Sequence, residues 1–107
     1  MKYNEKEIKS VIDFYVLRNF QKETGIKLSD IDQAIQNLEY TNKLCWLSIK
    51  RAYILEGYQV DKIPIKEEDV DNILTTNYAG FLEIFNDAVT KMFAQPSITK
   101  TGKKKLK

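Results

Sequence analysis

Along most of this chain, apolar residues recur at every third or fourth position, the spacing of one helix face, in five separable segments. The first segment runs from Glu5 to about Glu23, and Gly25 follows it as a candidate helix stop. Its apolar side chains fill a broad half-circle of the helix, with Phe14 and Leu17 outside that half-circle. An apolar surface wider than one face predicts a helix that contacts more than one neighbour.

The next two predicted helices differ in how far apolar residues surround them. Ser29 is a candidate N-cap for a short helix in which residues 31–38 carry one apolar face. Thr41 is a candidate cap for a third helix, which ends near Glu56 with Gly57 as its stop. Apolar side chains occur nearly all round this third helix, so we expect it at the centre of a bundle.

The C-terminal part of the pattern contains a loop and two further helices. Residues 57–64 are predicted to form a loop that a proline closes, and a short helix with an acidic start follows over residues 67–74. The Thr-Thr-Asn segment at residues 75–77 separates this helix from a last amphipathic helix, residues 78–94, and Pro96 ends it.

These patterns predict an all-α fold, a compact bundle of about five helices, in a single helical domain over residues 1–95. No segment alternates apolar and polar residues between turn signals, and residues 1–9 are too short and polar for a β-hairpin. Residues 96–107 contain only Ile98 and Leu106 as large apolar side chains, so we expect a disordered Lys-rich tail there.

Positive charge is concentrated in that predicted tail. Five of the 17 lysine and arginine residues lie among residues 95–107, which contain no acid, whereas the rest of the chain holds all 15 aspartate and glutamate residues. An acidic body repels phosphate, and the tail lacks the aromatic side chains on which bases stack. The sequence therefore favours a solubilising tail and argues against nucleic acid as the partner. Salt-sensitive binding of nucleic acid through the tail stays open as an alternative hypothesis.

Three features indicate a cytosolic protein. No apolar run approaches the roughly 18 to 20 residues that a membrane span needs. The first seven residues are polar and charged, unlike a secretory signal. The single cysteine, Cys45, cannot form an internal disulfide and fits a reducing compartment. We therefore expect a cytoplasmic location and no membrane partner.

The residue types that most enzymes and metal sites need are missing or isolated. The chain has no histidine, which removes the commonest general base, and Cys45 lies in an apolar helix as a small core residue. One cysteine cannot build a zinc site. Counted from Asp69, the sixth position of a calcium-binding loop would be Leu74 instead of the required glycine. The four glycines stand singly, so no glycine-rich phosphate-binding loop is predicted. We therefore predict no enzymatic activity, no cofactor and no bound metal.

The first predicted helix carries a spacing that is found in a known family. Phe14, Leu17, Phe20, Thr24 and Gly25 form the pattern Phe-x-x-Leu-x-x-Phe-x-x-x-Thr-Gly, which resembles the early helix of tail assembly chaperones of long-tailed bacteriophages. The likeness continues through a short helix, a hydrophobic helix that ends near Glu-Gly, and an acidic start before a final amphipathic helix. Two features depart from it, since many members open with a β-hairpin and a basic tail is no hallmark of the family.

The resemblance implies a chaperone in the host cytoplasm that binds the tape-measure protein, the tail-tube protein, or both, and keeps the client soluble before tail polymerisation. Its binding groove is expected among the surplus aromatic side chains, which are Phe14, Trp46, Tyr53, Phe81, Phe85 and Phe93. Burial in the core is the alternative for most of these rings. A small helical adaptor or regulator, such as a phage-encoded inhibitor or antitoxin that acts by stoichiometric protein binding, is the alternative function. Homo-oligomerisation stays open.

Overall fold

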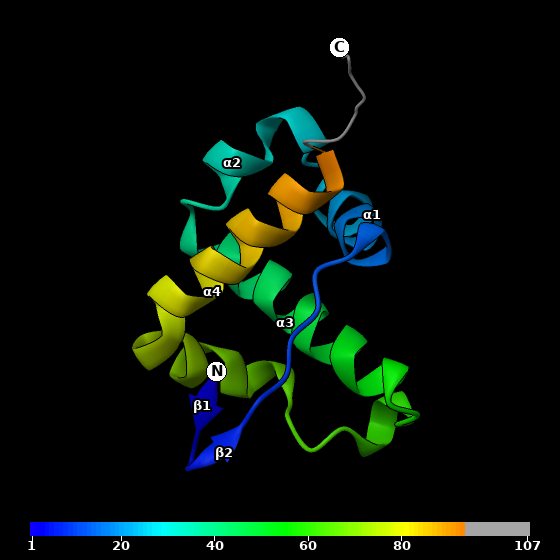
Figure 1. Ribbon diagram of the computed structural model, residues 1–107, viewed down its shortest axis with the longest axis vertical. Coiled ribbons are helices and arrows are strands. Elements are labelled where there is room, and N and C mark those ends of the chain that lie inside the picture. Colours follow the sequence, from blue (N-terminus) through cyan, green and yellow to red (C-terminus); the bar gives the residue numbers. More distant parts are fainter. Residues whose placement is uncertain (94–107) are drawn as a thin grey trace.

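The chain folds into a mostly helical structure, shown in Figure 1 as a computed structural model that describes residues 1–93. Its α-helices are α1 (Phe14–Thr24), α2 (Ile31–Ala34), α3 (Leu38–Leu55) and α4 (Val70–Phe93). The remaining elements are the strands β1 (Lys2–Tyr3) and β2 (Lys6–Glu7) and the 3-10 turns η1 (Leu28–Asp30), η2 (Val60–Lys62) and η3 (Glu67–Asp69). The predicted helical class is confirmed, whereas the number of helices and the presence of strands differ from the prediction. The predicted tail, residues 96–107, lies outside the described residues, as do the last residues of the predicted domain and final helix.

The chain opens with a minimal antiparallel β-hairpin, so the prediction that residues 1–9 are too short and polar for one is wrong. The paired residues are Lys2 with Glu7 and Tyr3 with Lys6. Its turn places two consecutive residues in the left-handed region, Asn4 at φ 52° and Glu5 at φ 63°. Asparagine adopts this conformation readily and glutamate rarely does, so the usual Asn-Gly signal of such a turn is missing.

Helix α1 begins at Phe14 instead of Glu5. The Asp13 side chain caps it, because one carboxylate oxygen accepts a hydrogen bond from the Val16 N–H at 3.0 Å. The other carboxylate oxygen accepts from Nε of Arg51 on α3 at 2.8 Å. The start of α1 is therefore fixed by a local cap and by a contact with the central helix.

The residues before α1 are extended where a helix was predicted. The Val11 N–H donates to the carbonyl of Ser48 in α3 at 3.0 Å, which holds residues 8–13 against that helix. Ile8 and Ile12 are both buried there. Residues four apart share a face in a helix and also in an extended strand, so this spacing does not distinguish the two conformations.

Helix α3 is the central element, as its all-round apolar pattern predicts, and α1 and α4 both pack against it. It begins at Leu38, where the Asn37 side chain accepts from the Glu39 N–H at 2.9 Å. The predicted cap, Thr41, lies one turn inside the helix instead. Its buried hydroxyl donates to the carbonyls of Ile35 and Asn37, so it joins the preceding turn to α3.

The two predicted glycine stops are confirmed. Gly25 follows α1 at φ 77°, and Gly57 lies beyond the C-cap of α3 at φ 101°. Both values lie in the left-handed region, where a side chain would be strained. These two positions set the lengths of α1 and α3.

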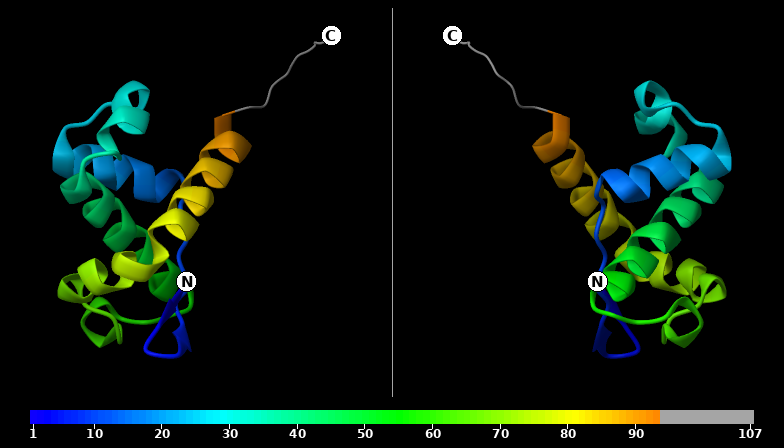
Figure 2. Two further views of the ribbon diagram at one scale, coloured as in Figure 1. Left: turned by 90° about the vertical axis from the view of Figure 1, so that its left-hand side faces the viewer. Right: turned by 90° about the vertical axis from the view of Figure 1, so that its right-hand side faces the viewer.

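The last two predicted helices form one continuous helix, α4, so the predicted break at residues 75–77 is wrong. The Thr75 hydroxyl donates to the Asp71 carbonyl and Asn77 Nδ2 donates to the Ile73 carbonyl, both at 2.8 Å. Polar side chains that bond back to the preceding turn often bend a helix without ending it. Figure 1 and Figure 2 both show α4 changing direction between its first turns and its longer C-terminal part.

The β-hairpin is attached to α4 through the same asparagine. Asn77 Nδ2 donates to the carbonyl of Lys2 at 2.8 Å, and its Oδ1 accepts from the Lys2 N–H at 3.3 Å. The side-chain amide thus pairs with the backbone of β1 much as a neighbouring strand would. The start of the chain is therefore fastened to the middle of α4.

One hydrophobic core joins the extended segment, α1, α3 and α4. Its buried side chains are Ile8, Ile12, Val16, Leu17, Phe20, Ile31, Ile35, Leu44, Cys45, Leu47, Ile49, Val70, Ile73, Phe81 and Phe85. Figure 2 shows α3 and α4 diverging from a shared lower end, with α1 lying across the upper, wider end. None of the helices in residues 1–93 combines the length and the apolar character that a membrane crossing requires.

Candidate partner-binding groove

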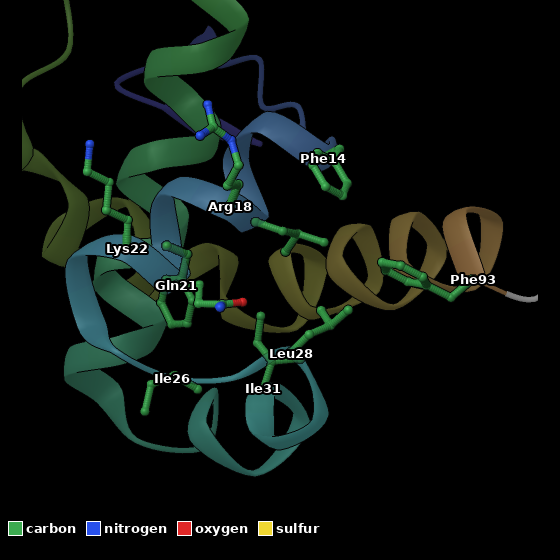
Figure 3. Close-up of a pocket in the computed structure, with 10 residues that line it drawn as sticks. Phe14, Arg18, Gln21, Lys22, Ile26, Leu28, Ile31 and Phe93 are labelled. Atoms are coloured by element: carbon green, nitrogen blue, oxygen red, sulfur yellow. The ribbon is translucent and has the colours of Figure 1, made fainter.

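A groove of about 480 Å³ lies between α1, the segment that contains η1, and the C-terminal end of α4. Figure 3 shows it with its lining side chains. These are Phe14, Leu17, Arg18, Phe20, Gln21, Lys22, Ile26, Leu28, Ile31 and Phe93. Three separate elements therefore contribute apolar side chains to one surface hollow.

The groove has a buried floor and an exposed apolar rim. Leu17, Phe20 and Ile31 form the floor and belong to the core. On the rim, Phe14 is 67% exposed and Phe93 is 48% exposed. Leu28, in η1, is 41% exposed and comes from the third side. Large apolar side chains that converge on one hollow while open to water are typical of a binding surface.

Within residues 1–93, no helix covers the rim. Helix α2 consists of four residues, Ile31–Ala34, and buries one side chain, Ile31, while Leu28 in η1 stays exposed. The C-terminal end of α4 diverges from α3 at the same end of the molecule (Figure 2). Phe93 therefore reaches past the core and lies against the groove instead of against another helix.

One edge of the groove is positively charged. Arg18 and Lys22 lie one helical turn apart on α1, and Figure 3 shows both side chains extending away from Leu28 and Ile31. Within residues 1–93, no carboxylate lines the groove and neither cation forms an ion pair. The apolar surface is thus bordered on the α1 side by two cations that are available to a partner.

The structure brings only two of the six predicted aromatic residues, Phe14 and Phe93, together in this groove. Phe81 and Phe85 are essentially inaccessible, with exposed fractions of 0% and 1%. They lie on the face of α4 that packs against the core, so the prediction that they contact a partner is corrected. For these two rings the alternative of core burial holds.

The other two predicted residues, Trp46 and Tyr53, lie on α3 outside the groove and are half-buried against the core. Lys50 is placed over the Trp46 ring, 5.8 Å from its centroid. Tyr53 meets Tyr58 edge-on at 5.1 Å, and burial raises the pKa of its hydroxyl. Both rings are half-buried and already contact a side chain, so they are poorer candidates for a client than Phe14 or Phe93.

Neither the cysteine nor any carboxylate of the described residues lines the groove. Burial raises the pKa of the Cys45 thiol to about 12, so it stays protonated and is a poor nucleophile. Residues 1–93 contain no group of three or more histidine, cysteine, aspartate or glutamate side chains that could hold a metal ion. The prominent chemical feature of the described surface is therefore an apolar groove with a basic edge.

Sequence reasoning missed three of the residues that define this groove: Leu28, Arg18 and Lys22. Leu28 lies between a helix stop and a helix cap, where a lone leucine is an exposed loop residue, and that position was a usable signal. The two cations had no such signal, because their role depends on which face of α1 the α4 helix leaves uncovered.

The fold and the groove together define a small helical protein with an open apolar groove on its described surface. Comparison of the chain with protein-family models, curated protein sequences and solved structures finds no significant match. Its function is therefore proposed from its own residues.

Proposed function

We propose that this chain is an assembly chaperone of the phage-tail type. It binds the tape-measure protein, the tail-tube protein, or both, and keeps the client soluble in the host cytoplasm until the tail polymerises. The observation that carries this proposal is the groove, in which Phe14, Leu28 and Phe93 converge from three elements while exposed to water.

The physical basis is the covering of apolar surface on both molecules. A long helical client with an uncovered apolar stripe aggregates in water, and an amphipathic helix lays such a stripe into a hydrophobic groove. Full burial of one large apolar side chain stabilises a complex by roughly 1.5 to 3 kcal/mol. The three rim side chains are partly exposed, so each retains surface that a client can cover.

The family resemblance adds support from the same place. Phe14, Leu17 and Phe20, which carry the resembling pattern, all line the groove. Phe14 belongs to the rim, and the other two belong to the floor. The pattern that suggests the family thus coincides with the surface that suggests binding. The short β-hairpin at residues 2–7 also removes one of the two departures from the family noted in the sequence.

Co-expression with the tape-measure protein of the same genome tests the proposal. We expect the client to remain soluble with the wild-type chain and to co-elute with it in size-exclusion chromatography. The double variant Phe14→Ser/Phe93→Ser removes the rim aromatics and is expected to lose both effects. Leu38→Ser is the matched control, because Leu38 is 73% exposed and lies outside the groove.

Two outcomes contradict the proposal. Unchanged client solubility together with separate elution of the two proteins rules out a chaperone for that client. Equal loss of activity in Leu38→Ser and in the groove variant removes the groove as the site. Fixed-stoichiometry binding of one compact partner, with no effect on client aggregation, supports the adaptor or regulator hypothesis instead.

A further inference from the structure

We infer that the groove selects a client helix whose apolar stripe is flanked by acidic residues on the side that faces α1. This inference rests on the proposed chaperone function and specifies the chemistry of its client. It follows from the distribution of charge around the groove, which is independent of the apolar rim.

The α1 edge carries only positive charge. Arg18 and Lys22 both lie beside the groove, and neither pairs with a carboxylate within residues 1–93. The acid next to them in sequence, Glu23, is engaged elsewhere by Lys43 at 3.4 Å. The two cations are therefore not neutralised by the described part of the chain.

The opposite wall has a different charge. It carries one exposed cation, Lys27, and two exposed acids, Asp30 and Asp32, and none of the three is among the residues that line the hollow. Among the lining residues, charge is therefore confined to the α1 edge. This asymmetry fixes how the client is rotated about its own axis, with its acidic flank toward α1.

The chain's own C-terminal segment, residues 94–107, has the opposite charge to the occupant inferred here. It follows directly after Phe93, which lines the groove, and it contributes five lysines and no acid. Like charges near Arg18 and Lys22 disfavour a basic segment at this edge and favour an acidic one. A basic client is disfavoured for the same reason.

The geometry suits a helix with acids one turn apart. Because Arg18 and Lys22 are four residues apart on α1, they match two carboxylates spaced by three or four residues on a client that runs alongside. The apolar floor and rim supply most of the affinity, whereas the charges decide which helices bind and how fast they associate.

Three synthetic peptides test the inference. Each has about 16 residues, long enough for measurable helicity, and the same leucine stripe at i, i+3, i+4 and i+7. They differ only at two flanking positions, which hold glutamate, glutamine or lysine. Titration calorimetry with the full wild-type chain is expected to give a dissociation constant about tenfold lower for the glutamate peptide than for the lysine peptide. The ratio should shrink to about threefold or less in roughly 0.5 M salt.

Charge reversal provides the decisive variant. Arg18→Glu/Lys22→Glu is expected to invert the preference between the glutamate and lysine peptides while the glutamine peptide binds as before. The matched control is Lys6→Glu/Lys62→Glu, which changes the net charge equally at two exposed positions outside the groove and should keep the wild-type preference.

The outcomes separate this inference from the proposed function. If all three peptides bind equally and Phe14→Ser/Phe93→Ser abolishes their binding, the groove is a docking site and the charge assignment is overturned. If no peptide binds although the wild-type chain still keeps the client soluble, the chaperone proposal stands and this inference fails. If the groove variant changes neither peptide binding nor client solubility, both fail.

Two competing occupants are tested with the same materials. If Ile98→Ser/Leu106→Ser strengthens the binding of all three peptides about tenfold, the chain's own terminal segment fills the groove and the inference is overturned. If sedimentation shows a dimer that Phe14→Ser dissociates, a second copy of this chain fills the groove, with the same consequence.

Discussion

The covered core and the open groove are built from the same kinds of side chain, yet water reaches only the groove. On α1, Phe20 is fully buried, whereas Phe14 is 67% exposed. On α4, Phe85 is buried in the same core, whereas Phe93 is 48% exposed. The two members of each pair lie less than three helical turns apart. Residue type alone therefore does not decide exposure here.

What decides it is whether a further element covers the face. Phe20 and Phe85 belong to the core that α1, α3 and α4 share, and Phe20 meets Tyr40 of α3 edge-on. Phe14 and Phe93 lie where α4 has diverged and where α2 is only four residues long. The groove is therefore a part of the core surface that no helix within residues 1–93 covers, and it is the place that a client helix takes in the proposed function.

The largest difference in stability is expected between removal of a buried ring and removal of an exposed ring on α1. Phe20→Ala leaves a cavity in the core and should lower the free energy of unfolding by about 3 to 5 kcal/mol. Phe14→Ala removes an exposed ring and should change it by no more than about 0.5 kcal/mol. Urea denaturation followed by circular dichroism measures both. Similar losses in the two variants would mean that Phe14 is part of the core and that the groove is closed in solution.

The contrast between the two regions also explains how much of the fold could be predicted. The central place of α3 and the stops at Gly25 and Gly57 were predictable, because all-round apolar character and isolated glycines have local physical causes. The hairpin was not, since Glu5 in its turn adopts a positive φ that glutamate rarely adopts. The continuity of α4 was not either, because the side chain of Asn77 bonds to Ile73 and to Lys2, and the Lys2 contact exists only in the folded chain.

The groove was predictable only in part, for a related reason. Phe14 was recognisable because it falls outside the apolar half-circle of its helix, although the predicted helix began too early. Phe81, Phe85 and Phe93 share one helix and one residue type, and sequence alone does not show where α3 ceases to cover α4. Exposure at such positions depends on the crossing of two helices, which is a property of the tertiary structure.

A smaller effect on the free energy of unfolding is expected at high pH, where ionisation of Cys45 tests whether water reaches the core. Burial raises the pKa of this thiol from 9.0 to about 12, so it stays neutral in the folded chain while it ionises in the unfolded chain. The stability is therefore full below about pH 9 and falls by roughly 1.4 kcal/mol for each pH unit above it, up to about pH 12. Urea denaturation of the wild type and of Cys45→Ala between about pH 8 and 10 measures the difference in slope.

Parallel pH profiles for these two proteins would show that water reaches Cys45.

A cysteine placed in the groove allows a comparison with the buried Cys45 thiol. Leu28→Cys in the Cys45→Ala background puts a cysteine where leucine is 41% exposed, and it should react with iodoacetamide under native conditions. The wild-type thiol is expected to react only when the chain unfolds. Equal native rates would remove the distinction between a covered and an open region.

The smallest effect concerns the residue that positions both regions on α1. Asp13 caps the helix through the Val16 N–H and also accepts from Arg51, so it fixes the start of the helix next to Phe14. Asp13→Ala loses both contacts and should lower the free energy of unfolding by about 1 kcal/mol. Asp13→Asn keeps a good cap and weakens only the contact with Arg51, a partly exposed ion pair, so it should cost about half as much or less. If Asn destabilises the chain as strongly as Ala, Arg51 and not the cap fixes the start of α1. In that case Arg51→Gln should displace α1. Loss of glutamate-peptide binding by this variant would show that the contact between Arg51 and Asp13 holds the groove in place.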